Sequence, residues 1–264
     1  MDDSVVALWE RAAQTYETEV PYFRRMGERI VAHAQLAPGD KVLDVACGKG
    51  ATLVPAAIAV GASGRVVGID IVPAMVEGAR AAAAGASLGN VDVEVMDAEE
   101  LQFDPGTFDV VINAFGLGFL RPDRALCETR RVLRDGGRLV ASAPLGGGPN
   151  WEFFGKLCAR YNLVSGAHPG GIAIPAPAEL LGLFESAGLR VDPPVQDAVE
   201  IDFADEESWW RWVWSHGQRA FLEGLDDAEV APFKAEAFAA LQSFATPAGV
   251  HLDQQFLVVN ATAV

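Results

Sequence analysis

The chain has 264 residues, of which 50% are hydrophobic, and 36 acidic side chains against 20 basic ones give it a formal net charge of −16. Such a surface repels phosphate backbones and anionic lipids, so we expect neither nucleic acid nor a membrane as a partner. The acidic N-terminus MDDSVVALWE and three scattered cysteines, Cys47, Cys127 and Cys158, predict a cytoplasmic protein with no signal peptide and no disulfide framework.

The first half of the chain alternates between strand and helix patterns. Residues 3–36 predict two helices before the turn APGD. Near-continuous apolar runs, typical of parallel strands buried on both faces, fall at 41–46, 65–70, 91–96, 108–113 and 138–143, with helical patterns at 51–61, 73–88 and 122–134. This alternation predicts a doubly wound α/β sheet with right-handed crossovers.

The pattern changes after Pro144. Helical patterns follow at 151–162, 177–188 and 226–244, together with an aromatic helix that begins at DEESWW, a strand at 195–203 and a final strand QQFLVVNATA, so the expected sheet is mixed and seven-stranded. We expect a single domain over 1–264: N-terminal helices (1–36), a cofactor-binding core (37–145), a substrate cap (146–175 and 204–250) and the last strands (189–203 and 254–264).

The stretch KVLDVACGKG runs from a predicted strand into a glycine-rich turn, where backbone approaches a ligand closely. Gly48 and Gly50 fit the dinucleotide fingerprint G-x-G-x-x-G, but Leu53 stands where the third glycine belongs. That glycine serves close helix–strand packing, so its absence disfavours a nicotinamide cofactor.

Acids lie at the ends of three predicted strands: Asp44, Asp70 and Asp97. Taken singly, each is explained as a buried acid or a helix cap. Taken together, they would repel a pyrophosphate and favour a nucleoside that carries positive charge. S-adenosylmethionine, with a sulfonium and an ammonium, is such a ligand.

Five motifs resemble those of the class I S-adenosylmethionine-dependent methyltransferases, and most closely the branch of the ubiquinone and menaquinone biosynthesis enzymes. In family order and spacing, over roughly residues 38–145, they are VLDVACGKG, VVGIDIVPAMVEGAR, VMDAEEL, FDVVINAFGLGFL and RRVLRDGGRLVASAP. Ala46 departs from the family by replacing the first glycine of D-x-G-x-G-x-G, and we expect its methyl group to be tolerated.

The resemblance implies a set of cofactor contacts. The turn beneath the methionine half and the ribose would be formed by Asp44, Ala46, Gly48 and Gly50, and the ribose hydroxyls would be held by Asp70. Adenine would lie against Ile71 and Met75, with its amino group at Asp97 and Ala98. The methionine moiety and the reacting centre would lie beside Asn113, Ala114 and Phe115.

The aromatic helix suggests an acceptor site. Trp209, Trp212, His216 and Arg219 form one stripe at helical spacing, which we expect to wall an apolar pocket, with Tyr16, Tyr22 and Phe23 completing it. Ordinary core packing is the alternative for each aromatic side chain. Of the four histidines, His216 is the expected general base, and no metal is expected.

These features predict methyl transfer to oxygen or carbon of a small hydrophobic acceptor, aromatic or polycyclic, of the kind found in antibiotic and other specialised metabolism. The alternative is an enzyme that binds the same cofactor but catalyses another reaction, such as a cyclisation. A nicotinamide-dependent oxidoreductase and a non-catalytic binding subunit are weaker rivals, and either a monomer or a homodimer is compatible with the sequence.

Overall fold

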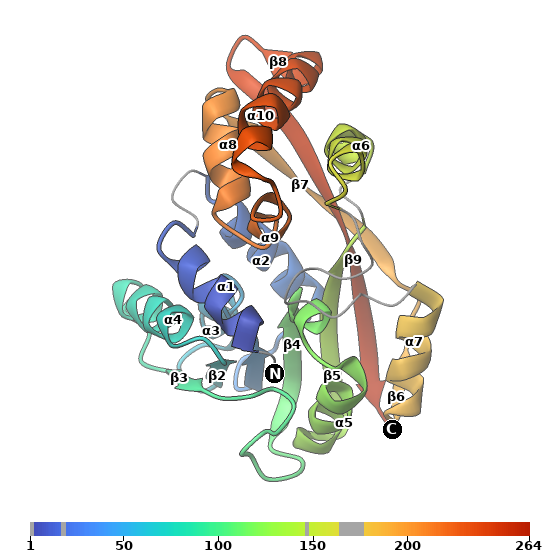
Figure 1. The fold of residues 1–264 in the computed structure, drawn as a ribbon. Coiled ribbons are helices and arrows are strands. Elements are labelled where there is room, and N and C mark those ends of the chain that lie inside the picture. The colour runs from blue at the N-terminus through green and yellow to red at the C-terminus, as the bar shows by residue number, and fades with distance from the viewer. Residues whose placement is uncertain (1–2, 17–19, 146–147, 164–176) are drawn as a thin grey trace.

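A computed structural model describes residues 3–16, 20–145, 148–163 and 177–264, and its centre is a twisted sheet with the order β3-β2-β1-β4-β5-β9-β6 (Figure 1). The first five of these strands run parallel, and β9 is antiparallel to both of its neighbours. Their bounds are β1 Lys41–Val45, β2 Arg65–Asp70, β3 Val91–Val95, β4 Phe108–Ala114, β5 Leu133–Pro144, β6 Leu189–Val191 and β9 Gly249–Ala263. The predicted doubly wound, mixed sheet is therefore confirmed.

Helices cover both faces of this sheet (Figure 1). On one face lie α2 Tyr22–His33, α3 Leu53–Val60 and α4 Pro73–Gly85, and on the other lie α5 Pro122–Val132 and α7 Pro177–Ser186. The N-terminal helix α1, Asp3–Ala13, contacts α4. Within the described residues, no helix is both long and apolar enough to span a membrane.

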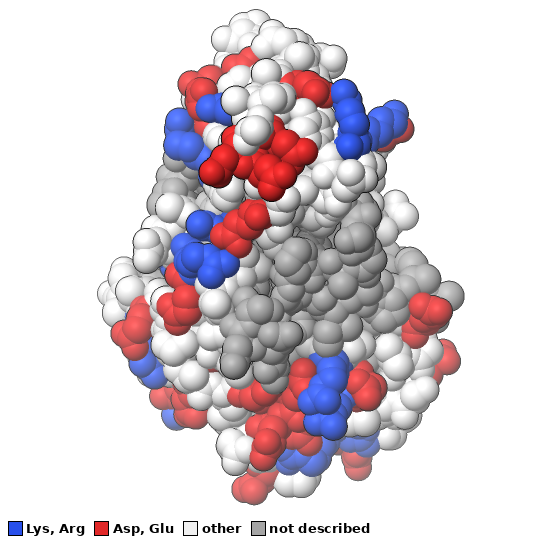
Figure 2. Space-filling model, viewed as in Figure 1, with Lys and Arg blue, Asp and Glu red and all other residues white. Residues whose placement is uncertain are grey.

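Acidic and basic side chains are interspersed over the described part of the face shown in Figure 2. Ion pairs among the described residues include Arg121 with Glu99 and Arg11 with Glu223.

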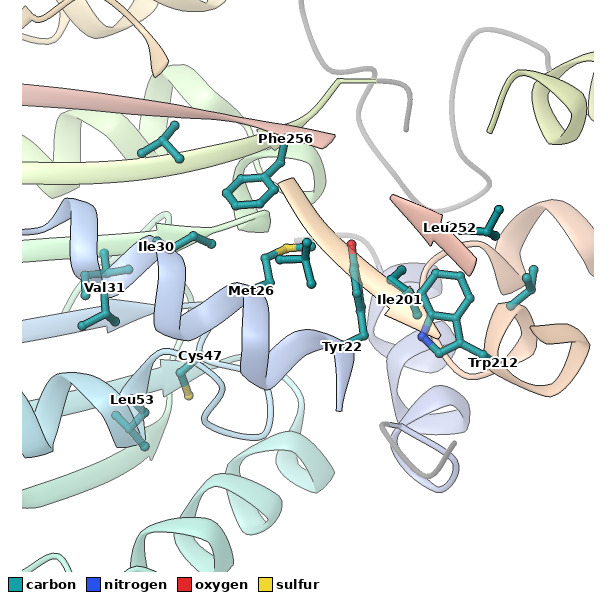
Figure 3. Packing of buried hydrophobic residues seen from close by; sticks show 14 of the residues in the cluster. Tyr22, Met26, Ile30, Val31, Cys47, Leu53, Ile201, Trp212, Leu252 and Phe256 are labelled. Atoms are coloured by element: carbon teal, nitrogen blue, oxygen red, sulfur yellow. The ribbon is translucent and has the colours of Figure 1, made fainter. Parts of the chain in front are cut away.

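Two apolar cores result from the burial of both sheet faces. Neighbouring residues of β1 point in opposite directions, so Val42 joins the core beneath α2 and α3, while Leu43 joins the core beneath α5 and α7. In the first core, Met26 of α2 lies near Phe256 of β9, and Tyr22 lies toward Trp212 (Figure 3). This core continues from the sheet into the region predicted as the cap.

The cap is built on an extension of β9, which runs from the top of the view to the C-terminus (Figure 1). Residues 250–258 of β9 pair with β7, Val195–Phe203, and a short β8, Ala245–Thr246, pairs with its first residues. Among the described residues the sheet thus has nine strands, where the sequence predicted seven. Pro193 and Pro194 separate β6 from β7, because neither residue can donate a ladder hydrogen bond.

The predicted aromatic helix is divided in two. Asp205 caps α8, Glu206–Trp214, by accepting from the Ser208 amide at 2.7 Å, and the helix ends where the Ser215 amide bonds back to Trp212 O at 2.9 Å. A short α9, Arg219–Leu222, follows. The predicted cap region also contains the helices α6 Glu152–Arg160 and α10 Asp227–Leu241 and the 3₁₀ turns Pro149–Trp151 (η2) and Gln242–Phe244 (η3). A further 3₁₀ turn, Gly116–Phe119 (η1), follows β4.

Candidate functional site

A cavity that is partly open to solvent lies at the carboxyl ends of β1, β2 and β4, with about 950 Å³ of empty space when its open part is included. Ligands of open α/β sheets bind at this edge. Its described lining is mostly apolar and comprises Val5, Trp9, Tyr16, Phe23, Met26, Gly27, Ile30, Ala46, Cys47, Gly48, Ala51, Thr52, Asp70, Ile71, Val72, Met75, Met96, Ala98, Ala114, Phe115, Gly116, Phe119 and Leu120.

The glycine turn, residues 46–50, forms the floor of this cavity beside β1. Gly48 and Gly50 have φ angles of 54° and 90°, which favour glycine. Ala46 adopts φ 55° despite its side chain, and its Cβ would lie 2.7 Å from a Cβ built on Gly116. The alanine in the family's glycine position is therefore accommodated by a glycine across the turn.

Asp70, at the end of β2, presents a half-buried carboxylate to the cavity. Its Oδ2 accepts from the Gly48 amide at 2.9 Å, and its Oδ1 accepts from the Val72 amide at 3.0 Å. Burial raises the pKa of Asp70, and these amide hydrogen bonds act in the opposite direction. The carboxylate is thus held in one orientation and retains lone pairs for ligand hydroxyls.

Asp44 lies behind the glycine turn, fully buried and outside the cavity lining. The Thr52 hydroxyl donates to its Oδ2 at 2.6 Å, and its Oδ1 has no hydrogen-bond partner among the described residues. Burial raises the pKa of Asp44 to about 7, opposed by the Thr52 hydrogen bond and helped by the charge of Asp70. Asp44 thus supports the glycine turn from beneath, and its part in cofactor binding stays a prediction.

The residues expected around adenine divide into two sets. Ile71, Met75 and Ala98 line the cavity and offer apolar faces for a planar ring. Asp97 does not belong to the described lining, and its Oδ1 accepts from the Glu99 amide at 2.9 Å; Gly50, expected in the glycine turn beneath the ribose, is also outside that lining. Asp97 thus orders the loop after β3.

At the end of β4, Asn113 is buried and its Oδ1 accepts from the Leu117 amide at 3.1 Å, so it shapes η1 instead of facing the cavity. Ala114 and Phe115 do line the cavity. Phe115 has a φ of 62°, an uncommon conformation for a bulky residue, which turns the chain into η1.

One part of the cavity wall is aromatic. Tyr16 and Phe23 stack with their ring centroids 4.3 Å apart, and Trp9 makes edge contacts with Tyr16 at 6.2 Å and Phe119 at 5.3 Å. Tyr16 and Phe23 were predicted for the acceptor site from the sequence, whereas the position of Trp9 and Phe119 on the cavity wall was not. The spacing of Val5 and Trp9 on one face of α1 was the available signal.

The other residues predicted for the acceptor wall lie away from the described lining. Trp209 packs against Phe154 of α6 at 5.9 Å, and Trp212 makes an edge contact with Tyr22 at 5.2 Å. Arg219 donates to Glu223 at 2.7 Å. The expected stripe depended on one continuous helix, and the break after Trp214 removes that continuity.

His216 lies in this break with 7% of its surface exposed, and it is outside the described cavity lining. Its Nδ1 donates to Trp212 O at 2.7 Å, and the centroid of its ring lies 4.1 Å from that of Trp212 and 5.5 Å from that of Phe23. Burial lowers the pKa of His216 to about 4. The structure therefore places this histidine in the cap core, one layer behind the wall.

The donor set fits S-adenosylmethionine better than a phosphorylated nucleoside. The described lining contains the Asp70 carboxylate but no lysine or arginine, and Asp44 lies beneath the turn. A ligand with hydroxyls, a flat apolar ring and positive charge suits this arrangement, because carboxylates favour cations and repel phosphates.

Comparisons with known proteins agree with this geometry. Residues 42–137 match the family described as "Methyltransferase domain". Nocamycin O-methyltransferase of Saccharothrix syringae is 32% identical over 87% of this chain and 88% of its own length, and a demethylmenaquinone methyltransferase of Bacillus cereus is 34% identical over 58% of this chain and 71% of its own.

Among solved structures, the [4+2]-cyclase SpnF superposes with a TM-score of 0.55 at 22% identity, over 91% of this chain and 81% of its own, which shows a shared fold. The extensive match to a named methyltransferase, on a sheet with the motifs at the strand ends, establishes the family and its cofactor. The chain belongs to the class I S-adenosylmethionine-dependent methyltransferases.

Proposed function

We propose that this methyltransferase methylates an oxygen atom of a small hydrophobic metabolite with an aromatic or polycyclic framework. One observation carries the proposal: a single cavity joins the glycine turn to an aromatic wall of Trp9, Tyr16, Phe23 and Phe119. Flat aromatic side chains favour a flat apolar ligand. Oxygen as the acceptor atom is supported by the similarity to nocamycin O-methyltransferase.

S-adenosylmethionine supplies a methyl group already activated on a sulfonium. We assign the cofactor half of the cavity to the residues predicted from the motifs. Ala46 and Gly48 would contact the methionine half with Ala114 and Phe115, Asp70 would accept from the ribose hydroxyls, and Ile71, Met75 and Ala98 would enclose adenine; Asp44, Gly50, Asp97 and Asn113 would support these from outside the lining.

The chain's contribution to the reaction is proposed to be alignment and exclusion of water. The titratable side chains of the described lining are Asp70, Tyr16 and Cys47, and Asp70 is engaged by two backbone amides. With His216 buried and neutral, we propose that the acidity of the acceptor itself supplies the nucleophile. Trp9 and Phe119 then hold the acceptor face beside the methyl donor.

The test uses purified protein, S-adenosylmethionine and a panel of phenolic, keto and amine acceptors, with mass spectrometry of both products. Methyl transfer requires one S-adenosylhomocysteine for each methylated acceptor. Trp9→Ala should raise the acceptor KM while the affinity for S-adenosylhomocysteine stays unchanged. Trp210→Ala is the matched control, because Trp210 packs in the cap against Phe233 at 6.2 Å.

Two outcomes would change the proposal. Consumption of an acceptor without S-adenosylhomocysteine would replace methyl transfer by the alternative, a non-methylating reaction such as a cyclisation. Equal acceptor KM values for Trp9→Ala and the unmodified protein would remove the aromatic wall from the acceptor site.

We further propose that residues 1–264 form a single methyltransferase domain that works in the cytoplasm on a small molecule and not on nucleic acid. Its net charge of −16 supports this, because it opposes binding to a polyanion. The free thiols of Cys47, Cys127 and Cys158 support a reducing compartment. In the predicted cap segment 146–175, residues 148–163 carry η2 and α6 and the other positions lie outside the described residues, while 204–250 carries α8 to α10.

A further inference from the structure

Helix α1 is attached to the cofactor side of the cavity by two polar contacts that the proposed chemistry does not use. Lys49 Nζ donates to the carbonyl oxygen of Ala13, the last residue of α1, at 2.5 Å. Glu10 Oε1 accepts from the Ala74 amide at 3.3 Å. Both partners of α1 therefore belong to segments assigned to the cofactor.

The path of the Lys49 side chain depends on a glycine in α4. This residue lies between Gly48 and Gly50, and its stem crosses α4 at Gly78. A Cβ at position 78 would come within 2.6 Å of Lys49 Cγ and 3.0 Å of Cδ, so a side chain there would displace the lysine. The ammonium ends at the C-terminus of α1, where carbonyls lack helical partners and the helix dipole favours a cation.

Glu10 makes the second attachment, at the N-terminal end of α4. The first turn of α4 has no side-chain cap of its own, because Val72 occupies the N-cap position. Glu10 supplies an oxygen to the Ala74 amide in that turn, where negative charge is favourable. Ile71 and Met75, which flank this point, line the cavity.

The other face of α1 belongs to the acceptor wall. Val5 and Trp9 line the cavity, and Tyr16 follows shortly after the helix ends. The Trp9 ring contacts Phe119 of η1 at 5.3 Å. A movement of α1 would thus shift the aromatic wall and break the contacts with the glycine turn together.

We propose that Lys49 is a positioning residue that fastens α1, and with it Trp9 and Tyr16, to the glycine turn. A cofactor that orders this turn would then also order the acceptor wall, so that cofactor binding precedes and promotes acceptor binding. Glu10 reinforces the same coupling through α4. This inference rests on the proposed function in treating Trp9 and Tyr16 as acceptor contacts.

Hydrogen exchange of the amides in residues 3–13, with and without S-adenosylhomocysteine, tests the coupling without an identified acceptor. In the unmodified protein, the ligand should slow exchange throughout α1. Lys49→Met keeps the stem over Gly78 but removes the ammonium, so ligand-induced protection of α1 should be lost. Calorimetry should show about tenfold weaker S-adenosylhomocysteine binding, in line with a lost charge-assisted hydrogen bond.

Two variants separate the coupling from a general loss of structure. Lys49→Arg retains a cationic donor and should restore much of the protection. Arg11→Gln removes a cation from the same helix, but its partner Glu223 lies beside α9 and the contact is exposed, so protection should remain. Melting temperatures of all variants show whether each remains folded.

Equal ligand-induced protection in Lys49→Met and the unmodified protein would overturn the inference, as would an equal loss in Arg11→Gln. Failure of the unmodified protein to bind S-adenosylhomocysteine would instead remove the cofactor assignment, and the inference with it. The two failures are distinguishable, because calorimetry reports the second before any variant is made.

Discussion

Replacing His216 by phenylalanine tests the reassignment of this residue from catalysis to the cap core. The imidazole is buried, and its burial lowers its pKa from 6.5 to about 4. Phenylalanine fills a similar volume among Trp212, Phe23 and Tyr22. The Trp212 carbonyl stays satisfied, because the Ser215 hydroxyl also donates to it at 2.7 Å.

The lowered pKa implies a stability that depends on pH. Between pH 6.5 and pH 4 the unfolded chain binds a proton at His216 that the folded chain does not, so the stability present above pH 6.5 is lost as the pH falls. The full shift corresponds to about 3 kcal/mol, and about 2 kcal/mol is already lost at pH 5. His216→Phe should lack this loss, while losing about 1 kcal/mol at pH 7.5 with the hydrogen bond to Trp212.

Urea unfolding at pH 7.5 and pH 5 measures the two free energies of unfolding, and the difference between variant and unmodified protein isolates His216 from other titrating groups. Turnover per folded molecule should change less than about threefold, whereas loss of a general base lowers the rate by about 10²–10⁴-fold. A variant that retains the unmodified pH dependence would contradict the burial argument. A hundredfold loss of turnover in a folded variant would restore His216 as the base.

In the ligand-free protein we expect the free energy of unfolding to fall by about 2 kcal/mol between pH 5.5 and pH 8, because the folded state is destabilised as the buried Asp44 carboxyl with its raised pKa ionises. Asp44→Asn should remove this fall, as measured by urea unfolding at both pH values, and an unchanged dependence on pH would contradict the raised pKa. Gly27→Ala should destabilise the fold by about 1–3 kcal/mol and weaken S-adenosylhomocysteine binding, because the added Cβ would lie 2.1 Å from Ala51 O. Gly155→Ala is the control, since a Cβ there would meet no neighbouring atom within 4 Å, and equal melting temperatures for the two variants would refute the clash. Asp70→Ala should weaken S-adenosylhomocysteine binding by about 1.5–3 kcal/mol in calorimetry, the range for hydrogen bonds to a charged group, and unchanged affinity in a folded variant would remove Asp70 from the ribose.

Much of the fold and of the cofactor half could be predicted from the sequence, because both depend on local patterns. Apolar runs separated by helical periods indicate parallel strands, and the carboxyl ends of such strands meet at one edge of the sheet. Asp70 ends β2, Ile71 follows it and Ala98 lies shortly after β3, so their place at the cavity follows from the order of the elements.

The acceptor half depended on tertiary structure. Helical spacing shows which side chains share a face, but not which element will cover that face. Trp209 and Trp212 were covered by α6 and α2, whereas Trp9 on α1 was left facing the cavity. His216 lies in the core because α8 ends after Trp214, where the Ser215 amide bonds to Trp212 O. The aromatic periodicity of the sequence does not reveal this end.

The sequence alone therefore determined the class of sheet, the edge that binds the cofactor and the acids near it, since neighbouring residues and strand order are enough for these. Only the folded chain decided that Lys49 reaches the end of α1, that Gly27 admits the Ala51 carbonyl, and which aromatic rings line the cavity. These contacts join residues distant in the sequence, and they depend on how closely two helices approach. That distance is set by the packing of the whole interior, and no local pattern encodes it.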